Sequence, residues 1–226
     1  MKYIAKIKSD FPSKFGIPRQ SGFAKSLRAE IIMEPEFRNI DLFDGIEEFS
    51  HLWILWEFSE NVGKAWTSKV RPPKLGGNEK KGVFATRSPF RPNPIGLSCV
   101  EFLGIEVDEK LGPILLVAGA DLMDGTPIYD IKPYIPYADC KTEASEGFTS
   151  QVEKQTLQIV FEKNLMEKID PKKRTALIEV LEMDPRPGYQ NDPKRIYGMP
   201  FGKWDIRFTV KDGILTVIEI VDVTEQ

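Results

Sequence analysis

The chain has 226 residues, of which 41% are apolar, and its 31 Lys and Arg against 34 Asp and Glu give a net charge of −3. This length and composition fit one globular domain, alone or with a small appendage. No stretch approaches the roughly 18 consecutive apolar residues of a membrane span, and the N-terminal sequence MKYIAKIKSDFPSKFG lacks the apolar core of a signal peptide. We therefore expect a cytoplasmic protein without a membrane segment.

Histidine and cysteine are too scarce for several kinds of site. His51 is the only histidine, which excludes catalysis or metal binding by several imidazoles, and its place before an apolar run favours a strand start. Cys99 and Cys140 cannot by themselves form a disulfide framework or a zinc site. A reducing compartment fits this cysteine usage.

The first part of the chain is predicted to be mainly β. Alternating or dense apolar patterns, punctuated by Gly and Pro, predict strands over 2–8, 29–33, 52–58, 82–86, 97–107 and 113–120, with short helical turns around 40–49. Many short strands of this kind favour a β-barrel or sandwich over a doubly wound sheet.

The last part of the chain is predicted to form a small α+β unit. A polar stretch at 138–149 is typical of a linker, and the apolar spacing in 150–169 predicts a helix. Asp170 and Pro171 are typical of the cap and first position of a second helix that runs to about Met183. The alternation around Trp204, a turn at 211–213 and a returning strand predict a hairpin. We expect two domains, 1–140 and 141–226.

Common nucleotide-binding signatures are absent from the sequence. None of the seventeen glycines is spaced as G-x-G, so the chain has neither the dinucleotide fingerprint nor the glycine-rich loop of the common methyltransferase fold. A phosphate-binding G-x-x-x-x-G-K-[ST] loop is missing as well. Any nucleotide cofactor must be held in another way.

Four segments combine Pro and Gly with functional side chains: 15–23, 70–98, 120–139 and 183–192. In the second, three prolines within six residues hold Arg87 and Arg91 on a stiff backbone, which suits planar anionic groups. A proline-stiffened loop with solvated arginines is the alternative. The third contains four aspartates and three tyrosines, which suit a cationic ligand. Divalent metal binding competes with that interpretation, but the spacing of a calcium loop is missing.

Long motifs in these segments resemble a known family. The stretches PRQSGF, ATRSPFRPNPIGLS, DGTPIYDIKPYIPYAD and DPRPGY are similar to those of the TrmO (TsaA-like) family of tRNA methyltransferases. The resemblance covers about Tyr3 to Asp139 and resumes at 183–213. It implies a non-Rossmann β-barrel methyltransferase domain with a small α+β C-terminal domain, and homodimers that bind S-adenosylmethionine near the subunit interface.

The resemblance also implies site residues. Cofactor contacts are expected at Pro18, Arg19, Gln20, Arg87, Leu97, Gly119, Ala120 and Asp121. Bacterial relatives end the third strand with Phe-His, whereas this chain has Phe58, Ser59 and Glu60. Ser59 and Glu60 are expected to touch the cofactor, largely through backbone groups, but a histidine role cannot be carried over. The C-terminal domain is expected to contact tRNA and to leave the cofactor to the barrel.

The implied reaction is methyl transfer to N6 of N6-threonylcarbamoyladenosine beside the anticodon, at tRNA position 37. Its urea-like nitrogen is a poor nucleophile while protonated, so a general base is needed. The candidates are Asp121, Tyr129 and Asp184, and the sequence does not choose among them. Arg91 and Arg186 are candidates for the threonyl carboxylate, and Tyr189, Lys194 and Arg195 for other tRNA contacts.

Two rival functions stay open at this point. One is an S-adenosylmethionine-dependent methyltransferase with a small-molecule acceptor, which a C-terminal domain without RNA affinity would favour. The other is a non-catalytic regulator that binds the cofactor. No metal is expected in any of these cases.

Overall fold

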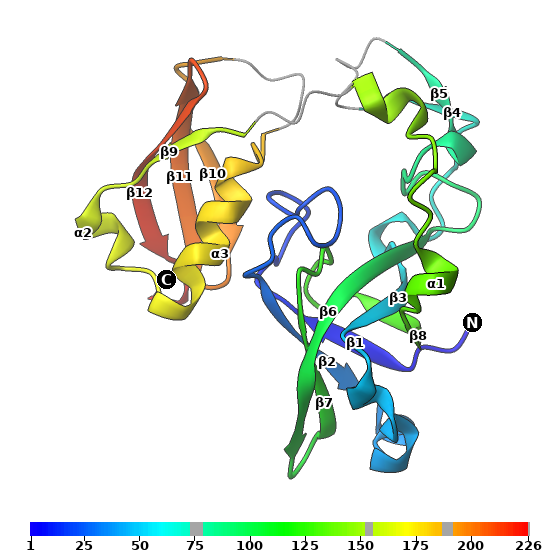
Figure 1. Ribbon diagram of the computed structural model, residues 1–226. Helices are drawn as coiled ribbons and strands as arrows, with labels where there is room; N and C mark the ends of the chain where they lie inside the picture. Colours follow the sequence, from blue (N-terminus) through cyan, green and yellow to red (C-terminus); the bar gives the residue numbers. More distant parts are fainter. Residues whose placement is uncertain (73–78, 152–155, 187–191, 226) are drawn as a thin grey trace.

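The computed structural model describes residues 1–72, 79–151, 156–186 and 192–225, which form two units lying side by side (Figure 1). The first unit is a β-barrel with long connecting loops, and the second is a four-stranded sheet with one long helix. The mainly β prediction with an α+β appendage is confirmed. In the described part of the chain, no helix is long and apolar enough to cross a membrane.

The barrel is a closed ring of antiparallel strands in the order β1-β2-β7-β6-β3-β8. Its strands are β1 (Ala5–Lys8), β2 (Arg28–Met33), β3 (His51–Glu57), β6 (Ile95–Asp108), β7 (Gly112–Ala118) and β8 (Pro127–Pro133). Alternate side chains point inward, so that Leu52, Ile54 and Trp56 of β3 are buried. Predicted strand positions around β1, β2, β3, β6 and β7 agree with the structure, and His51 does begin β3.

Short elements lie between the barrel strands and, in the case of α1 and η7, after the last barrel strand. They are the 3-10 turns η1 (Pro35–Phe37), η2 (Ile40–Phe43), η3 (Ile46–Glu48), η4 (Ser59–Asn61), η6 (Val83–Ala85) and η7 (Gly147–Gln151), the two-residue strands β4 (Lys69–Val70) and β5 (Lys81–Gly82), and helix α1 (Pro136–Asp139). The expected helical turns around 40–49 are confirmed by η2 and η3. The strand expected over 82–86 is wrong, because the backbone N–H of Thr86 closes a turn on the Val83 carbonyl at 3.1 Å.

The C-terminal unit has the strand order β10-β11-β12-β9. Its elements are β9 (Gln158–Val160), α2 (Lys163–Met166), α3 (Pro171–Glu182), β10 (Tyr197–Phe201), β11 (Trp204–Lys211), β12 (Ile214–Asp222) and the turn η8 (Val223–Glu225). A single helix over 150–169 is wrong, because residues 158–160 pair in parallel with β12. Tertiary strand pairing there overrides the local apolar spacing. Val152, one of the residues behind that prediction, lies outside the described residues.

Helix α3 and the hairpin are confirmed in detail. The Asp170 carboxylate accepts a hydrogen bond from the Lys172 N–H at 2.9 Å, and Pro171 occupies the first turn. Strands β11 and β12 join through Asp212 and Gly213, whose φ angles of 50° and 78° suit a tight hairpin turn.

Two hydrophobic cores are found among the described residues. One fills the barrel. The other lies between α3 and the C-terminal sheet, and it includes Phe11, Ala24 and Leu27 from the segment between β1 and β2. Residues 9–27, here called the β1–β2 loop, therefore leave the barrel and pack into the core of the second unit.

Candidate functional site

The carboxylate of Asp121 is the centre of the candidate site. Asp121 follows the end of β7, and its Oδ1 atom accepts a hydrogen bond of 2.5 Å from the Ser98 hydroxyl of β6. The Ser98 oxygen in turn accepts one of 2.9 Å from the Trp56 indole N–H of β3. Ser98 and Trp56 are both buried in the barrel wall. Three strands thus fix one carboxylate at the end of the barrel.

The environment of this carboxylate changes its acidity. Burial raises the pKa of Asp121, although the Ser98 hydroxyl, a backbone N–H and nearby Arg87 act in the opposite direction. A carboxyl group whose pKa is raised toward neutrality is a better proton acceptor than an ordinary surface aspartate. Asp121 thus lies near Arg87, another of the predicted cofactor residues.

The β1–β2 loop meets Asp121 from one side. The Gly22 N–H donates to the Gly119 carbonyl at 2.8 Å, and the Ser21 hydroxyl accepts from the Cys99 N–H at 3.1 Å. The side-chain amide oxygen (Oε1) of Gln20 accepts a hydrogen bond from the Arg87 guanidinium. The segments PRQSGF, ATRSPF and GADL, which are separate in sequence, therefore converge.

Close backbone packing at this point requires glycine. Gly119 has a φ of 73°, in the left-handed region that disfavours side chains, and an added Cβ would lie 3.1 Å from the Cα of Gly22. Pro18 and Ala120 are buried beside these glycines, whereas Arg19 is exposed. The loop and the segment after β7 form one rigid wall.

The segment 183–192 reaches the same region, but its charged side chains are paired with each other and not free for a substrate. Arg186 donates from Nε and Nη2 to the two oxygens of Asp184, at 2.8 Å each. The Arg186 carbonyl accepts from Arg19 at 3.4 Å, which joins the DPRPGY motif to PRQSGF. Because Asp184 and Arg186 satisfy each other, neither presents a free charge. Tyr189 of this motif lies outside the described residues.

Tyr129 lies in a separate cluster. It follows Ile128, which points into the barrel core, so the Tyr129 side chain lies on the other side of β8. Its hydroxyl donates to Glu57, which also accepts from the Tyr3 hydroxyl at 2.5 Å. Burial raises the pKa of Tyr129, and the hydrogen bond to Glu57 adds to this effect. A hydroxyl held as a donor in this way is poorly suited to accept a proton.

The other predicted residues are distributed around the site. Ser59 and Glu60 form η4, and Glu60 pairs with Lys14 of the β1–β2 loop at 2.6 Å. Leu97 projects outward from β6 with 52% of its surface exposed.

Basic residues expected to contact substrate have mixed settings. Arg91 donates from Nη1 to the Thr86 carbonyl at 3.1 Å and thereby braces its own loop. Arg195 lies over the Tyr197 ring at 5.4 Å in the C-terminal unit, and Lys194 is exposed next to it in sequence.

Sequence reasoning missed the residues that support Asp121. Ser98 stands in the quoted motif, yet its role was not predicted. The sequence did carry a signal, because Gly96, Ser98 and Val100 are every second residue of a strand and therefore share its inward face. A polar residue at a core-facing position requires a hydrogen-bond partner. The Trp56 indole and the Asp121 carboxylate provide it.

The residues at the site fit an S-adenosylmethionine-type ligand. A partly buried carboxylate can accept hydrogen bonds from amine or ribose groups, and an exposed arginine can meet a carboxylate. The Gly119 carbonyl, which accepts from the Gly22 N–H, has a second lone pair for a ligand. No group of three or more potential metal ligands occurs among the described residues.

A closed barrel with a largely buried carboxylate, at which Gly- and Pro-rich loops converge, defines a candidate ligand-binding site outside the Rossmann fold. Comparison with known families specifies it further. The model of the tRNA-methyltransferase O N-terminal domain matches residues 6–140, and that of the TrmO C-terminal domain matches residues 151–223. The chain belongs to the tRNA-methyltransferase O family.

Relatives and solved structures agree with this assignment. The tRNA (adenine(37)-N6)-methyltransferase of Escherichia coli is 40% identical over 224 residues, covering 92% of each chain. A protein of the same name from Eikenella corrodens is 42% identical and covers 78% of this chain and 99% of its own. The crystal structure of TrmO from Pseudomonas aeruginosa has a TM-score of 0.77 at 30% identity and covers 97% of both chains.

Proposed function

We propose that this protein methylates N6 of N6-threonylcarbamoyladenosine at position 37 of tRNA. The observation that carries this proposal is the Asp121 carboxylate, whose pKa is raised by burial at the point where the family motifs converge. The names of the relatives support adenine 37 as the target. The threonylcarbamoyl group is the finer part of the proposal and is argued from chemistry.

S-adenosylmethionine is the proposed cofactor, and it supplies an electrophilic methyl group when bound. Gln20, Arg87 and Asp121 would hold it with side chains, and Gly119 with the second lone pair of its backbone carbonyl. Ser59, Glu60 and Leu97 are proposed to border the same site. Arg87 is oriented for this work by its hydrogen bond to Gln20, which fixes the guanidinium plane.

Asp121 is proposed to accept the proton of the N6–H group. Transfer would break the methyl–sulfur bond, whose electron pair would stay on the sulfur of a neutral thioether, and form the N6–methyl bond. The N6–H electron pair would remain on nitrogen while the proton moves to an oxygen of Asp121. A urea-type N–H is more acidic than the amine of plain adenine, so a carboxylate can assist its removal more readily. Ser98 keeps Oδ1 oriented, at 2.5 Å, so that the other oxygen can face the substrate.

The threonyl carboxylate needs a cationic partner, and Arg91 is the stronger of the two candidates. Its Nη1 braces the loop backbone, while hydrogen-bond donors on Nε and Nη2 have no partner among the described residues. Arg186 is paired with Asp184 through two bonds and is only 10% exposed. A second anion would have to displace that pair.

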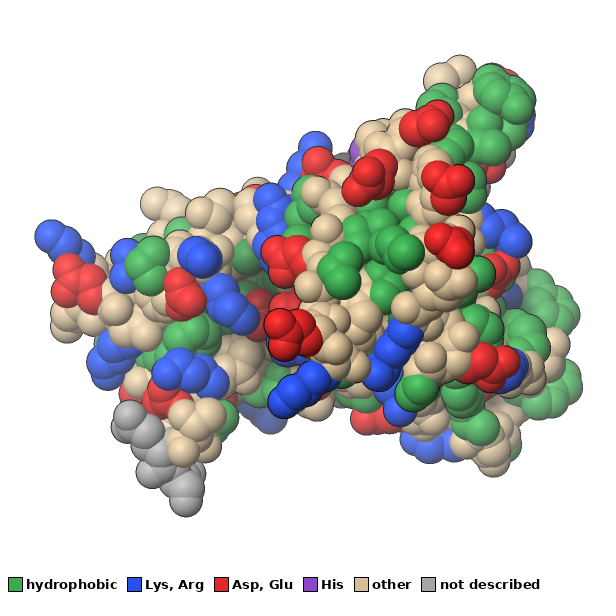
Figure 2. All heavy atoms as spheres, turned by 90° about the horizontal axis from the view of Figure 1, so that it is seen from below, with side chains coloured by type: hydrophobic (Ala, Val, Ile, Leu, Met, Phe, Trp, Pro, Cys, Tyr) green, Lys and Arg blue, Asp and Glu red, His purple; other side chains and the backbone are tan. Residues whose placement is uncertain are grey.

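The C-terminal unit is proposed to bind the phosphate backbone of tRNA. Lys and Arg side chains are frequent on this unit, at the left of Figure 2. Exposed examples are Lys172, Lys194 and Arg195, and exposed Lys69, Arg71 and Lys80 lie on the long barrel loop. Such contacts would weaken with salt, because bound phosphates release counterions.

A homodimer in the cytoplasm is also proposed. The barrel and its loops leave large apolar side chains exposed, among them Phe23 at 57%, Phe84 at 78% and Leu97 at 52%. Apolar groups near a site are typical of interfaces. Sedimentation equilibrium should give twice the 25.7 kDa chain mass, and a monomer at micromolar concentration would refute the dimer.

The function is tested with two transcripts of one tRNA sequence, of which only one carries the threonylcarbamoyl group. Labelled methyl transfer from S-adenosylmethionine should occur on the modified transcript alone. Equal transfer to both would show that the enzyme does not need the threonylcarbamoyl group, and adenine 37 would remain the proposed target. Absence of transfer to either transcript, despite cofactor binding, would refute the methyltransferase function.

A further inference from the structure

We propose that the C-terminal unit controls the affinity of the cofactor site, and that Glu179 of α3 is the positioning residue. This inference rests on the proposed function, because it concerns the same cofactor site. It changes the expected division of labour, in which the C-terminal domain serves only tRNA. The argument follows the β1–β2 loop, which carries Pro18, Arg19 and Gln20.

The apolar residues of the loop belong to the core of the C-terminal unit. Phe11, Ala24 and Leu27 are each no more than 3% exposed and pack in that core. The Phe11 ring meets the Phe201 ring of β10 edge to face, with centroids 5.8 Å apart. Without the C-terminal unit, these side chains would lose most of their burial.

The start of the loop is also held by polar contacts to the second unit. The Asp10 carboxylate pairs with Lys173 of α3, and the Asp10 carbonyl accepts from the Gly202 N–H at 2.7 Å. Gly16 lies so close to Met199 that an added Cβ would clash with the Met199 sulfur. The loop therefore packs on the C-terminal unit as well as on the barrel, which it meets through Ser9 and Lys14.

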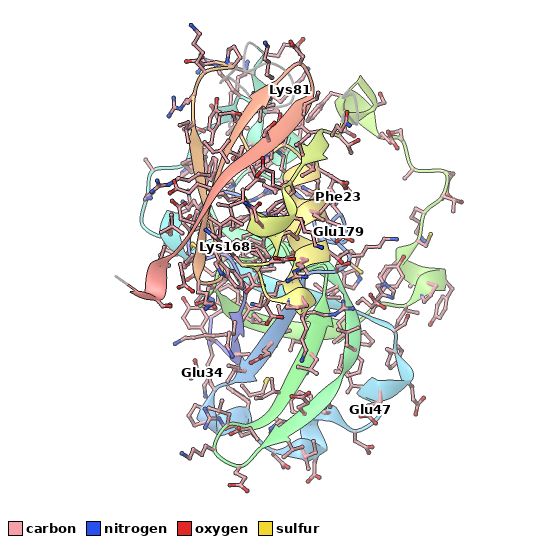
Figure 3. All side chains as sticks on the ribbon, turned by 90° about the vertical axis from the view of Figure 1, so that its left-hand side faces the viewer. Phe23, Glu34, Glu47, Lys81, Lys168 and Glu179 are labelled. Atoms are coloured by element: carbon pink, nitrogen blue, oxygen red, sulfur yellow. The ribbon has the colours of Figure 1, made fainter. Side chains whose placement is uncertain are left out.

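Glu179 fixes the far end of the loop with both carboxylate oxygens. One oxygen accepts from the Ser26 N–H and the other from the Ser26 hydroxyl, at 2.8 Å each. Glu179 on α3 and Phe23 of the loop are both labelled in Figure 3, where they lie close together. Two bonds to one carboxylate restrain Ser26 in both position and orientation.

The restraint on Ser26 passes directly to the cofactor residues. The neighbouring Leu27 carbonyl accepts from the Gly119 N–H at 3.0 Å, and the Gly22 N–H donates to the Gly119 carbonyl. Gly119 precedes Ala120 and Asp121 in the chain. The loop is thus held between α3 on one side and the Gly119 segment on the other. These contacts position Arg19 and Gln20, which belong to the same loop.

A loop that is docked for only part of the time binds its ligand more weakly, because the apparent dissociation constant equals the intrinsic one divided by the docked fraction. Loss of both bonds in Glu179→Ala should raise the dissociation constant of S-adenosylmethionine by about tenfold. Glu179→Gln should recover much of the affinity, since the amide oxygen still accepts one bond. Ser26→Ala, which keeps the N–H bond, should have an intermediate effect.

The experiment uses the full chain, with cofactor binding measured by calorimetry and folding by the thermal midpoint. Glu182→Ala is the matched control, because Glu182 lies on the same helix and makes no side-chain hydrogen bond or ion pair among the described residues. It should bind the cofactor like the wild type. In methyl transfer, Glu179→Ala should raise KM for the cofactor while kcat at saturating cofactor changes less than about twofold.

The outcomes separate this inference from the proposed function. Wild-type protein that binds no S-adenosylmethionine would refute the proposed function and this inference with it. Wild-type binding together with an unchanged dissociation constant in Glu179→Ala would refute the positioning role alone. A lowered thermal midpoint with unchanged affinity would make Glu179 merely structural. If Glu179→Ala does not fold, Ser26→Ala and Glu179→Gln decide the question in the same way.

Discussion

Two carboxylates of the barrel, Asp121 and Glu57, are both partly or fully buried but differ in what surrounds them. Glu57 accepts from the hydroxyls of Tyr3 and Tyr129, whose rings stack with centroids 5.1 Å apart. Asp121 accepts from the Ser98 hydroxyl and lies near Arg87, whose guanidinium donates to the Gln20 side chain.

The comparison distinguishes a carboxylate that stabilises the barrel from one that is available for catalysis. Both oxygens of Glu57 are used by neutral donors that tie the N-terminal segment to β8, so its charge is satisfied within the protein. Asp121 keeps hydrogen-bonding capacity, and its raised pKa reflects incomplete compensation for burial. Four substitutions test this contrast.

The largest effect is expected for Asp121→Asn. Loss of a general base typically lowers the rate by a hundredfold or more, so kcat/KM for methyl transfer should fall at least about a hundredfold. Steady-state kinetics on modified tRNA measure this. A loss below about tenfold would assign the proton to water or to another group.

The same substitution should affect stability in the opposite direction. Burial raises the folded-state pKa of Asp121, so between the unfolded and folded pKa values the folded chain binds more protons. The free energy of unfolding then decreases as pH rises through that window, and the penalty persists at neutral pH. Asp121→Asn removes the penalty and should raise the thermal midpoint at pH 7, but not below the unfolded pKa of about 4.

Arg87→Ala is expected to have the next largest effect. A charge-assisted hydrogen bond is typically worth about 1.5–3 kcal/mol, so the dissociation constant of S-adenosylmethionine should rise roughly tenfold to a hundredfold. Arg91→Ala is the matched comparison and should change cofactor affinity by less than about threefold. If calorimetry shows a larger loss of cofactor affinity for Arg91→Ala than for Arg87→Ala, Arg91 is the cofactor residue and Arg87 is not.

Ser98→Ala should produce a smaller effect that depends on pH. The Ser98 hydroxyl lowers the pKa of Asp121, so its removal should raise that pKa further. Because the base must be ionised to accept a proton, the acidic limb of the kcat/KM profile should move to higher pH. If the acidic limb of the kcat/KM profile does not move, the group that titrates there is not Asp121.

Tyr129→Phe should have the smallest effect on activity. The substitution removes one hydrogen bond to Glu57, which should cost about 1 kcal/mol of unfolding free energy in a denaturant titration. Methyl transfer should stay within about twofold of wild type. A loss as large as that of Asp121→Asn would place Tyr129 in the reaction and remove the contrast between the two clusters.

The sequence by itself determined the parts of the fold that depend on local pattern. Alternation predicted the strand around β1, a dense apolar run predicted β3, and an Asp cap followed by Pro predicted α3. It failed at 158–160, where a parallel pairing with β12 gives the segment a strand partner that no local signal announces.

The motifs fixed which loops matter, because long Pro- and Gly-rich stretches with charged groups are rarely needed for packing alone. Sequence could not select Asp121 over Tyr129 and Asp184, since all three are ordinary residues in such stretches. Tertiary structure distinguished them by neighbours: Asp184 meets Arg186, Tyr129 meets Glu57, and Asp121 meets Ser98 and Arg87.

Tertiary structure alone joined the β1–β2 loop to the second unit. Phe11 and Leu27 lie close in sequence to β1 and β2, and nothing local indicates that they are buried in the core beneath α3, about 150 residues further along the chain. Burial and hydrogen bonding between distant segments depend on the closed backbone arrangement, which local propensity does not encode. The link from Glu179 to the cofactor loop is therefore a property of the fold.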